Sequence, residues 1–156
     1  MLVEHINNPN DEKELQALIE RMIDISKSKG SKVTTQRILI FKELARKTKE
    51  HPSAEEIYES LKDKVYGLSI STVYRALSTF EELGLVRRIA TPDGRAHYEI
   101  AVKPHGHFIC QNCKKVFDIE DIQEPLEHIR EQLKEKGYTV NECNFVCYGI
   151  CPSCQN

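Results

Sequence analysis

The spacing of hydrophobic residues over the first two-thirds of the chain predicts four helices. Between residues 11 and 28, apolar side chains recur every three or four positions, as on the buried face of a helix. A second helix is expected over 35–47. A third begins at the capping-box sequence Ser53-Ala54-Glu55-Glu56. The fourth is expected over 70–83, between the N-cap Ser69 and the C-terminal Gly84.

Two alternating segments, 86–91 and 95–101, follow these helices and flank the turn Pro92-Asp93-Gly94. This pattern predicts a β-hairpin. Helices followed by a hairpin indicate a winged helix-turn-helix domain over residues 1–100, whose fourth helix would enter the major groove of DNA. The candidate DNA contacts are Ser71, Thr72, Tyr74 and Arg75 on that helix, and Arg87, Arg88 and Arg95 on the hairpin. The alternative is a protein-binding winged helix whose arginines only face solvent.

The last third of the chain predicts a small α/β domain over residues 105–156, joined through a hinge at 101–104. Strands are expected at 105–110, 116–120 and 138–148, with a helix from Pro125 to about Gly137. The fold class is therefore α+β. A small sheet leaves unpaired strand edges, and pairing between two chains would cover them, so we expect a homodimer.

Two Cys-x-x-Cys pairs, Cys110/Cys113 and Cys151/Cys154, bracket this domain. Four thiolates arranged in two turns suit a tetrahedral structural zinc ion, and a segment of about 50 residues buries too little to be stable alone. Disulfides or a redox Cys-x-x-Cys are the alternatives. The remaining Cys143 and Cys147 are expected to be small buried hydrophobic residues in the last strand.

Charge is distributed unevenly along the chain. Residues 26–90 carry 13 Lys and Arg against 8 Asp and Glu, whereas residues 104–156 carry 5 against 8. A basic half next to an acidic half favours a module that binds a polyanion joined to a different module. No signal-peptide pattern and no apolar run of about 20 residues is present, so we expect a cytoplasmic protein without a membrane segment.

Histidines and carboxylates gather around the predicted hinge. Strand alternation places His105 with His107, Asp118 with Glu120, and His97 with Glu99, while His51 precedes the third helix. A mixed nitrogen and oxygen donor set suits Fe(II), Mn(II), Zn(II) or Ni(II). Each of these residues, taken singly, could equally be a surface group or a helix cap. By alternation, the histidines and the four cysteines lie on opposite faces and form separate sites.

Three segments, EHPSAEEIY at 50–58, STVYR at 71–75 and HGHFICQNC at 105–113, closely resemble the ferric uptake regulator family. The resemblance covers roughly residues 15–154. It implies a homodimeric, metal-dependent repressor that binds double-stranded operator DNA. The family's structural zinc ligands fall on the four cysteines named above. Its regulatory metal ligands fall on His51, Glu99, His105, His107 and Asp118, which leaves His97 as a spare.

The same resemblance bears on the signal that the protein senses. Glu99 resembles iron-sensing members and Asp118 matches peroxide-sensing ones, while Arg75 is similar to the iron and zinc regulators. Iron-responsive repression is our first expectation, with peroxide, zinc or manganese sensing as alternatives. Pro104, Gly106 and Cys143 stand where many iron regulators have ligands of an extra site, so that site is expected to be absent or altered.

An enzymatic function is not expected. A metal-dependent hydrolase could use the same histidines and carboxylates, but it needs an open ligand position and a substrate pocket. The sequence contains no nucleophile motif, and a small winged-helix domain is not expected to enclose a deep pocket. We therefore expect neither catalysis nor a small-molecule substrate.

Overall fold

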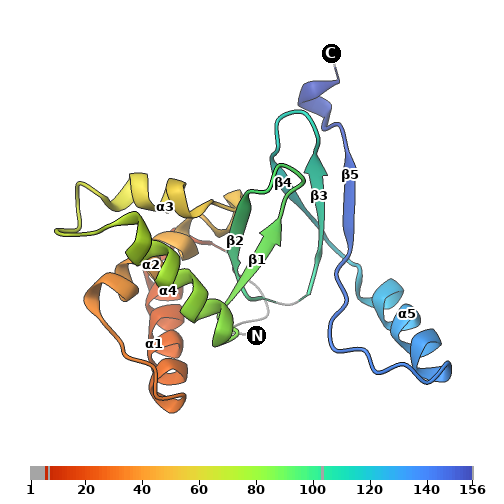
Figure 1. Ribbon diagram of the computed structural model, residues 1–156, viewed down its shortest axis with the longest axis horizontal. Helices are drawn as coiled ribbons and strands as arrows, with labels where there is room; N and C mark the ends of the chain where they lie inside the picture. Colours follow the sequence, from red (N-terminus) through yellow and green to blue (C-terminus); the bar gives the residue numbers. More distant parts are fainter. Residues whose placement is uncertain (1–5, 7, 103, 156) are drawn as a thin grey trace. The chain divides into compact units, whose positions relative to one another are not determined.

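The computed structural model describes residues 6, 8–102 and 104–155, and it divides into two compact units, residues 1–103 and 104–156 (Figure 1). The elements of each unit are described within that unit. The predicted hinge includes residue 103, which lies outside the described residues.

Unit 1 contains four α-helices and a two-stranded sheet. The helices are α1 (Glu12–Ser28), α2 (Thr35–Arg46), α3 (Ala54–Leu61) and α4 (Ile70–Glu82), with the 3-10 turn η1 (Thr48–Glu50) before α3. Each of these α-helices begins at a side-chain cap. Ser53 and Ser69 are the caps that the sequence predicts, and Ser53 and Glu56 form the complete capping box of α3. The capping residues satisfy amide groups that the first helical turn leaves without a carbonyl partner.

One hydrophobic core holds unit 1 together. The rings of Phe41 on α2 and Phe80 on α4 meet edge to face, with centroids 5.4 Å apart. Leu15 from α1, Ile57 from α3 and Ile100 from the sheet are fully buried against the same core. Every element of the unit therefore contributes to a single core, which fixes α4 against the sheet.

The sheet of unit 1 is the predicted hairpin. Strands β1 (Val86–Ala90) and β2 (Ala96–Ile100) are antiparallel, and Arg87 lies opposite Glu99. The N–H of Tyr98 donates to the carbonyl of Pro52 over 2.9 Å, which attaches the segment before α3 to β2. The unit thus has the element order and packing of a winged helix-turn-helix domain.

Unit 2 is a three-stranded sheet with one helix. Strands β3 (Gly106–Cys110), β4 (Val116–Ile119) and β5 (Val146–Gly149) have the order β4-β3-β5, and α5 (Gln123–Glu135) lies between β4 and β5 in sequence. The 3-10 turn η2 (Pro152–Cys154) follows β5. Strand β3 pairs antiparallel with β4 and parallel with β5. Few side chains are buried here, so the unit depends on additional cross-links.

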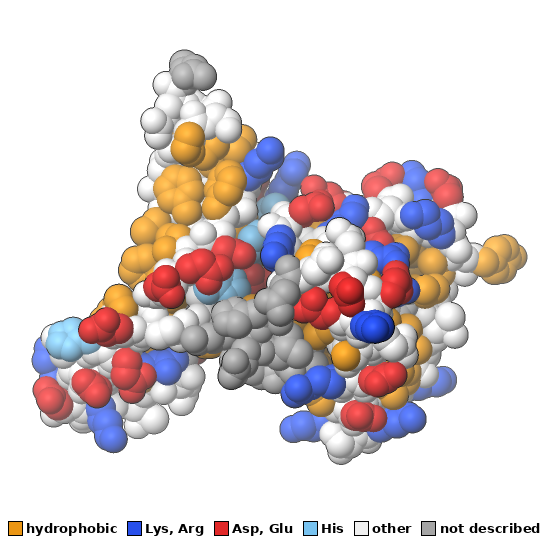
Figure 2. Space-filling model, turned by 180° about the vertical axis from the view of Figure 1, so that it is seen from behind, with side chains coloured by type: hydrophobic (Ala, Val, Ile, Leu, Met, Phe, Trp, Pro, Cys, Tyr) orange, Lys and Arg blue, Asp and Glu red, His pale blue; other side chains and the backbone are white. Residues whose placement is uncertain are grey.

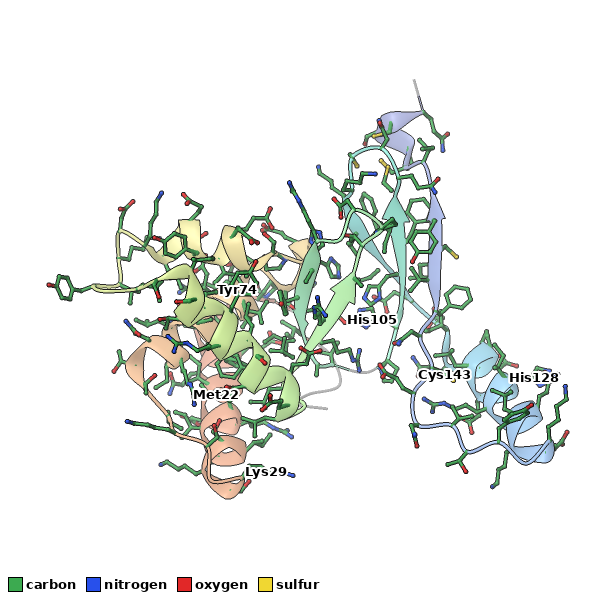
Figure 3. The ribbon with its side chains drawn as sticks, viewed as in Figure 1. Met22, Lys29, Tyr74, His105, His128 and Cys143 are labelled. Atoms are coloured by element: carbon green, nitrogen blue, oxygen red, sulfur yellow. The ribbon has the colours of Figure 1, made fainter. Side chains whose placement is uncertain are left out.

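The prediction of one strand over 138–148 is wrong for most of its length. Only Val146–Gly149 form β5, and residues 138–145 have no strand structure. The pairing explains the difference, because β3 lies beside β5 only from His107, opposite Val146, to Cys110, opposite Gly149, and the residues before 146 form part of the crossover between these parallel strands. Cys143 therefore lies in the loop before β5 (Figure 3), and both Cys143 and Cys147 are half-buried rather than fully buried.

Candidate metal centres and DNA-binding face

Four cysteines come together at one end of unit 2. Cys110 ends β3, Cys113 lies in the turn after it, Cys151 directly precedes the η2 turn and Cys154 is the last residue of that turn. Their sulfur atoms all lie within 4.8 Å of one another. All six cysteines of the chain are free thiols, and the Sγ atoms of Cys113 and Cys151 are 3.8 Å apart, far longer than a disulfide bond.

The surroundings of these thiols favour a cation. Backbone N–H groups, first that of Cys151 at 3.4 Å from the sulfur, lower the pKa of the Cys110 thiol to about 6. Burial raises the pKa of the Cys151 thiol to about 12. Two buried sulfurs so close together cannot both carry a negative charge without a compensating cation. The donor set therefore fits a structural zinc ion, which would complete the small core of unit 2.

A buried histidine and carboxylate pair lies in unit 1. The Nε2 atom of His51 is 3.3 Å from Oε2 of Glu99, and the two side chains are 1% and 3% exposed. Burying a carboxylate is costly unless it is paired with a cation or hydrogen-bonded. The sheet positions this pair, because Glu99 faces inward from β2 and the segment before α3 is attached to the same strand.

The backbone around His51 is held in an uncommon conformation. His51 has a φ of +50°, in the left-handed region that non-glycine residues rarely adopt. Nδ1 of His97 donates to the carbonyl oxygen of His51 over 2.7 Å. The amide of Ile100 also donates to the Thr48 hydroxyl, over 2.9 Å. His97, the spare candidate ligand, thus hydrogen-bonds through Nδ1 to the backbone that carries His51.

A second group of metal-binding side chains lies in unit 2. Asp118 on β4 faces His107 on β3, its cross-strand partner, with Oδ1 3.8 Å from His107 Nε2. The same oxygen is 3.2 Å from Nε2 of His105, and the two imidazole rings meet edge to face. The predicted pairing of His105 and His107 on one face thus leads to a compact group of two imidazoles and one carboxylate at the start of β3. His105 is labelled in Figure 3.

Gly106 separates these two histidines and has no space for a side chain. A β-carbon at Gly106 would lie 2.9 Å from Cδ1 of Phe145, closer than real β-carbons approach. The amide of His107 donates to the carbonyl of Phe145 over 3.0 Å, which fixes this close contact. Position 106 therefore accommodates only glycine without a shift of Phe145.

Four of the seven candidate DNA contacts line one groove of unit 1, with a volume of about 870 Å³, between α4 and the hairpin. They are Tyr74, Arg75, Arg88 and Arg95. Ser71 and Thr72 lie at the start of α4, where their hydroxyls are 3.1 and 2.8 Å from Oγ of the N-cap Ser69. The groove thus gathers a phenol and three arginines beside the exposed surface of α4.

Sequence reasoning missed two features of this groove and its strand. The Tyr74 hydroxyl donates to the Glu55 carboxylate, and this hydrogen bond lowers the pKa of Glu55 and raises that of Tyr74. Glu55 lies within the capping-box sequence, and nothing in the sequence indicates that the distant Tyr74 bonds to its carboxylate. Arg87 was grouped with the wing arginines, but its guanidinium is directed at Glu99, with Nη1 3.6 Å from Oε1.

These observations define the class of protein. A winged helix-turn-helix unit precedes a unit containing a four-cysteine cluster, and both units carry histidines and carboxylates. This combination is characteristic of a metal-responsive DNA-binding regulator. Among the described residues, no helix is long and apolar enough to cross a membrane.

Comparison with known proteins gives the family. Residues 28–148 match the ferric uptake regulator family. The chain is 32% identical to the ferric uptake regulation protein of Synechococcus elongatus, covering 81% of this chain and 88% of that protein. It is 28% identical to the peroxide operon regulator of Bacillus subtilis, covering 87% and 92%. The structure matches the Helicobacter pylori ferric uptake regulator, described as having three functional metal binding sites, with a TM-score of 0.77 and 31% identity over 91% of this chain and 94% of that chain.

The chain belongs to the ferric uptake regulator family, and it is a metal-responsive transcriptional repressor. Its relatives include both iron and peroxide regulators, so the signal is not given by the family alone. The cysteine cluster fits a structural zinc site, and the histidine and carboxylate groups fit regulatory binding of iron, manganese or zinc.

Proposed function

We propose that the protein is a homodimeric, Fe(II)-responsive repressor that binds double-stranded operator DNA in the cytoplasm when a regulatory metal is bound. The observation that carries the proposal is that each unit holds an incomplete set of metal donors. Unit 1 offers the His51 and Glu99 pair, and unit 2 offers the group of His105, His107 and Asp118. Neither the two donors of unit 1 nor the three of unit 2 would complete the coordination shell of Fe(II) or Mn(II), whereas the five together would supply most of it.

This division of donors explains how metal could control DNA binding. With its charge and coordination preference, a divalent cation would favour the arrangement in which both sets of donors reach it. The connection at 101–104 would act as the hinge between the units. Metal binding shifts the population towards the arrangement of the two units that has the higher metal affinity. If that arrangement also spaces the two α4 helices of a dimer to fit successive major grooves, metal would promote DNA binding. The four-cysteine cluster would not take part in this response.

The groove beside α4 supports the DNA-binding role. Arg75 lies on α4, where a guanidinium can reach the O6 and N7 atoms of guanine in the major groove. Arg88 and Arg95 lie on the hairpin, where side chains reach phosphates. Glu55 orients Tyr74 in this groove through their hydrogen bond.

Exposed apolar side chains on unit 2 support dimer formation through this unit. Phe117 on β4, Tyr148 on β5 and Ile150 after it are 41%, 53% and 41% exposed, and Figure 2 shows hydrophobic side chains on the surface of this unit. Phe117 lies opposite Phe108 and Tyr148 opposite Ile109, so the exposed rings lie on both faces of the sheet. Strands β4 and β5 are both edges of the sheet. A second copy of the chain that packed against these edge strands would cover exposed apolar side chains, as an obligate apolar interface does.

Iron sensing is favoured over peroxide sensing by one residue. A peroxide sensor needs an open coordination position on Fe(II) and a neighbouring imidazole that can be oxidised. Glu99 is one methylene longer than aspartate, and its buried carboxylate could bind through both oxygens and occupy that position. Peroxide sensing, and zinc or manganese sensing, are the alternatives. We propose no catalytic activity and no small-molecule substrate.

Gel shifts under anaerobic conditions test this function. Protein that retains its structural zinc would be mixed with duplexes selected from a random pool, with Fe(II), with Mn(II) or with neither. We expect a specific complex of two chains per duplex only when Fe(II) or Mn(II) is present. Equal binding without added metal, or no DNA binding in any condition, would contradict the proposal.

A further inference from the structure

Arg87 differs from the other arginines of the hairpin in what its side chain contacts. It lies on β1 directly opposite Glu99 on β2. Its Nη1 atom is 3.6 Å from Oε1 of Glu99, and Nη2 donates to the carbonyl of Val102 over 2.5 Å. The neighbouring Arg88 is exposed and lines the groove beside α4. Alternation along one strand therefore directs the two arginines to different sides.

The Glu99 carboxylate thus has a permanent cationic neighbour. Its other oxygen lies near His51, and its side chain is 3% exposed. The bond to the Val102 carbonyl holds the cation in place, because a side chain anchored at a second point cannot simply turn into solvent.

We propose that Arg87 is a resident competing cation that sets the affinity of the regulatory site for divalent metal. The inference rests on the proposed function, in which Glu99 is a metal ligand. A divalent ion bound by Glu99 would lie within several Å of the Arg87 guanidinium, and the two cations would compete for the same carboxylate. The repulsion is only partly screened because the pair is largely buried.

Arg87 has opposite effects on the stability of the metal-free protein and on the affinity for metal, and the two can be measured separately. In the metal-free protein Arg87 stabilises the fold, since a buried carboxylate without a counter-charge is costly. In the metal-bound protein it weakens binding, so that the site fills only at a higher concentration of free metal. Removing the charge should therefore lower the stability of the metal-free protein and tighten its binding of metal. A residue that merely oriented Glu99 would show the first effect and the reverse of the second.

The test compares Arg87→Met, Arg87→Lys and the matched control Arg88→Met. Each full-length protein, with structural zinc retained, would be titrated with Mn(II) while free Mn(II) is followed by electron paramagnetic resonance. Thermal unfolding of the same proteins would be measured without Mn(II). We expect Arg87→Met to bind Mn(II) about tenfold more tightly than wild type and to unfold at a lower temperature. Arg87→Lys, which keeps the charge, should stay within about threefold of the wild-type affinity, and Arg88→Met should keep the wild-type affinity for Mn(II).

The outcomes separate this inference from the proposed function. If wild type binds Mn(II) but Arg87→Met binds it equally or more weakly, the competing-cation role is wrong and the proposed function stands. The role is equally wrong if Arg87→Lys tightens binding as much as Arg87→Met, because the charge is then not the cause. If wild type binds no metal beyond its structural zinc, the proposed function itself fails.

Discussion

The imidazole of His97 holds the backbone of His51, because its Nδ1 donates to the His51 carbonyl oxygen over 2.7 Å. His51 has a left-handed backbone, which costs a non-glycine residue about 1 kcal/mol and must be stabilised by its surroundings. The hydrogen bond therefore links a residue that is not itself a proposed ligand to the position of one that is.

Replacing His97 should weaken metal binding without unfolding unit 1. We expect His97→Ala to reduce Mn(II) affinity about fivefold, since one hydrogen bond of about 1 kcal/mol no longer holds the His51 backbone. His97→Asn offers an amide donor near the place of Nδ1 and should recover most of the affinity. Mn(II) titration checks both variants. An unchanged affinity in His97→Ala would show that His51 needs no such support.

The cysteine cluster makes a prediction about metal content. Replacing Cys110, Cys113, Cys151 or Cys154 with serine should remove about one zinc ion per chain and weaken the dimer, because the small core of unit 2 depends on the cross-link. Cys143→Ser and Cys147→Ser are the matched controls and should keep their zinc. Metal analysis with sedimentation measures both properties. Zinc loss from Cys143→Ser would overturn this choice of ligands.

The two sides of the DNA groove should respond differently to mutation. Arg75→Ala should weaken binding to a selected duplex more than to random duplex, by about tenfold, since a base contact carries discrimination of about 1–3 kcal/mol. Arg88→Ala should weaken both alike and flatten the salt dependence, as loss of a phosphate contact does. Fluorescence anisotropy at several salt concentrations gives both quantities. Equal discrimination by Arg75→Ala and wild type would exclude base reading by this arginine.

Iron and peroxide sensing differ in a chemical product. In a peroxide sensor, oxidation adds one oxygen atom to a ligand imidazole, which here would be His51 or His105. Because we expect Glu99 to occupy the open coordination position, Fe(II)-loaded protein should survive low-micromolar peroxide with both histidines intact and DNA binding retained. Peptide mass spectrometry after brief exposure checks this. One added oxygen at either histidine, with loss of DNA binding, would establish peroxide sensing instead.

Local sequence patterns predict most elements of this fold because the capping signals are local. Ser53, Ser69 and Gly84 mark helix ends through contacts with residues three or four positions away. The prediction of a strand over 138–148 is wrong for most of the segment because its apolar residues resemble a strand. The length of β5 depends instead on pairing with β3, which is distant in sequence.

The candidate sites divide in the same way. The spacing of Cys110 with Cys113, and of His105 with His107, identifies donors that local geometry brings together. Neither the turn of Arg87 towards Glu99 nor the bond from His97 to His51 could be predicted. Both depend on the register of β1 against β2 and on the attachment of the segment before α3, which are tertiary features.

The reciprocal effect of DNA on metal affinity tests the central claim most directly. If regulatory metal and operator DNA favour the same arrangement of the two units, each must tighten binding of the other by the same factor. Mn(II) titrations of wild type, with and without a saturating selected duplex, measure this factor, and His51→Ala with intact structural zinc serves as the control. We predict that DNA tightens Mn(II) binding at least tenfold in wild type and has no effect in His51→Ala. Equal Mn(II) affinity of wild type with and without DNA would contradict the account.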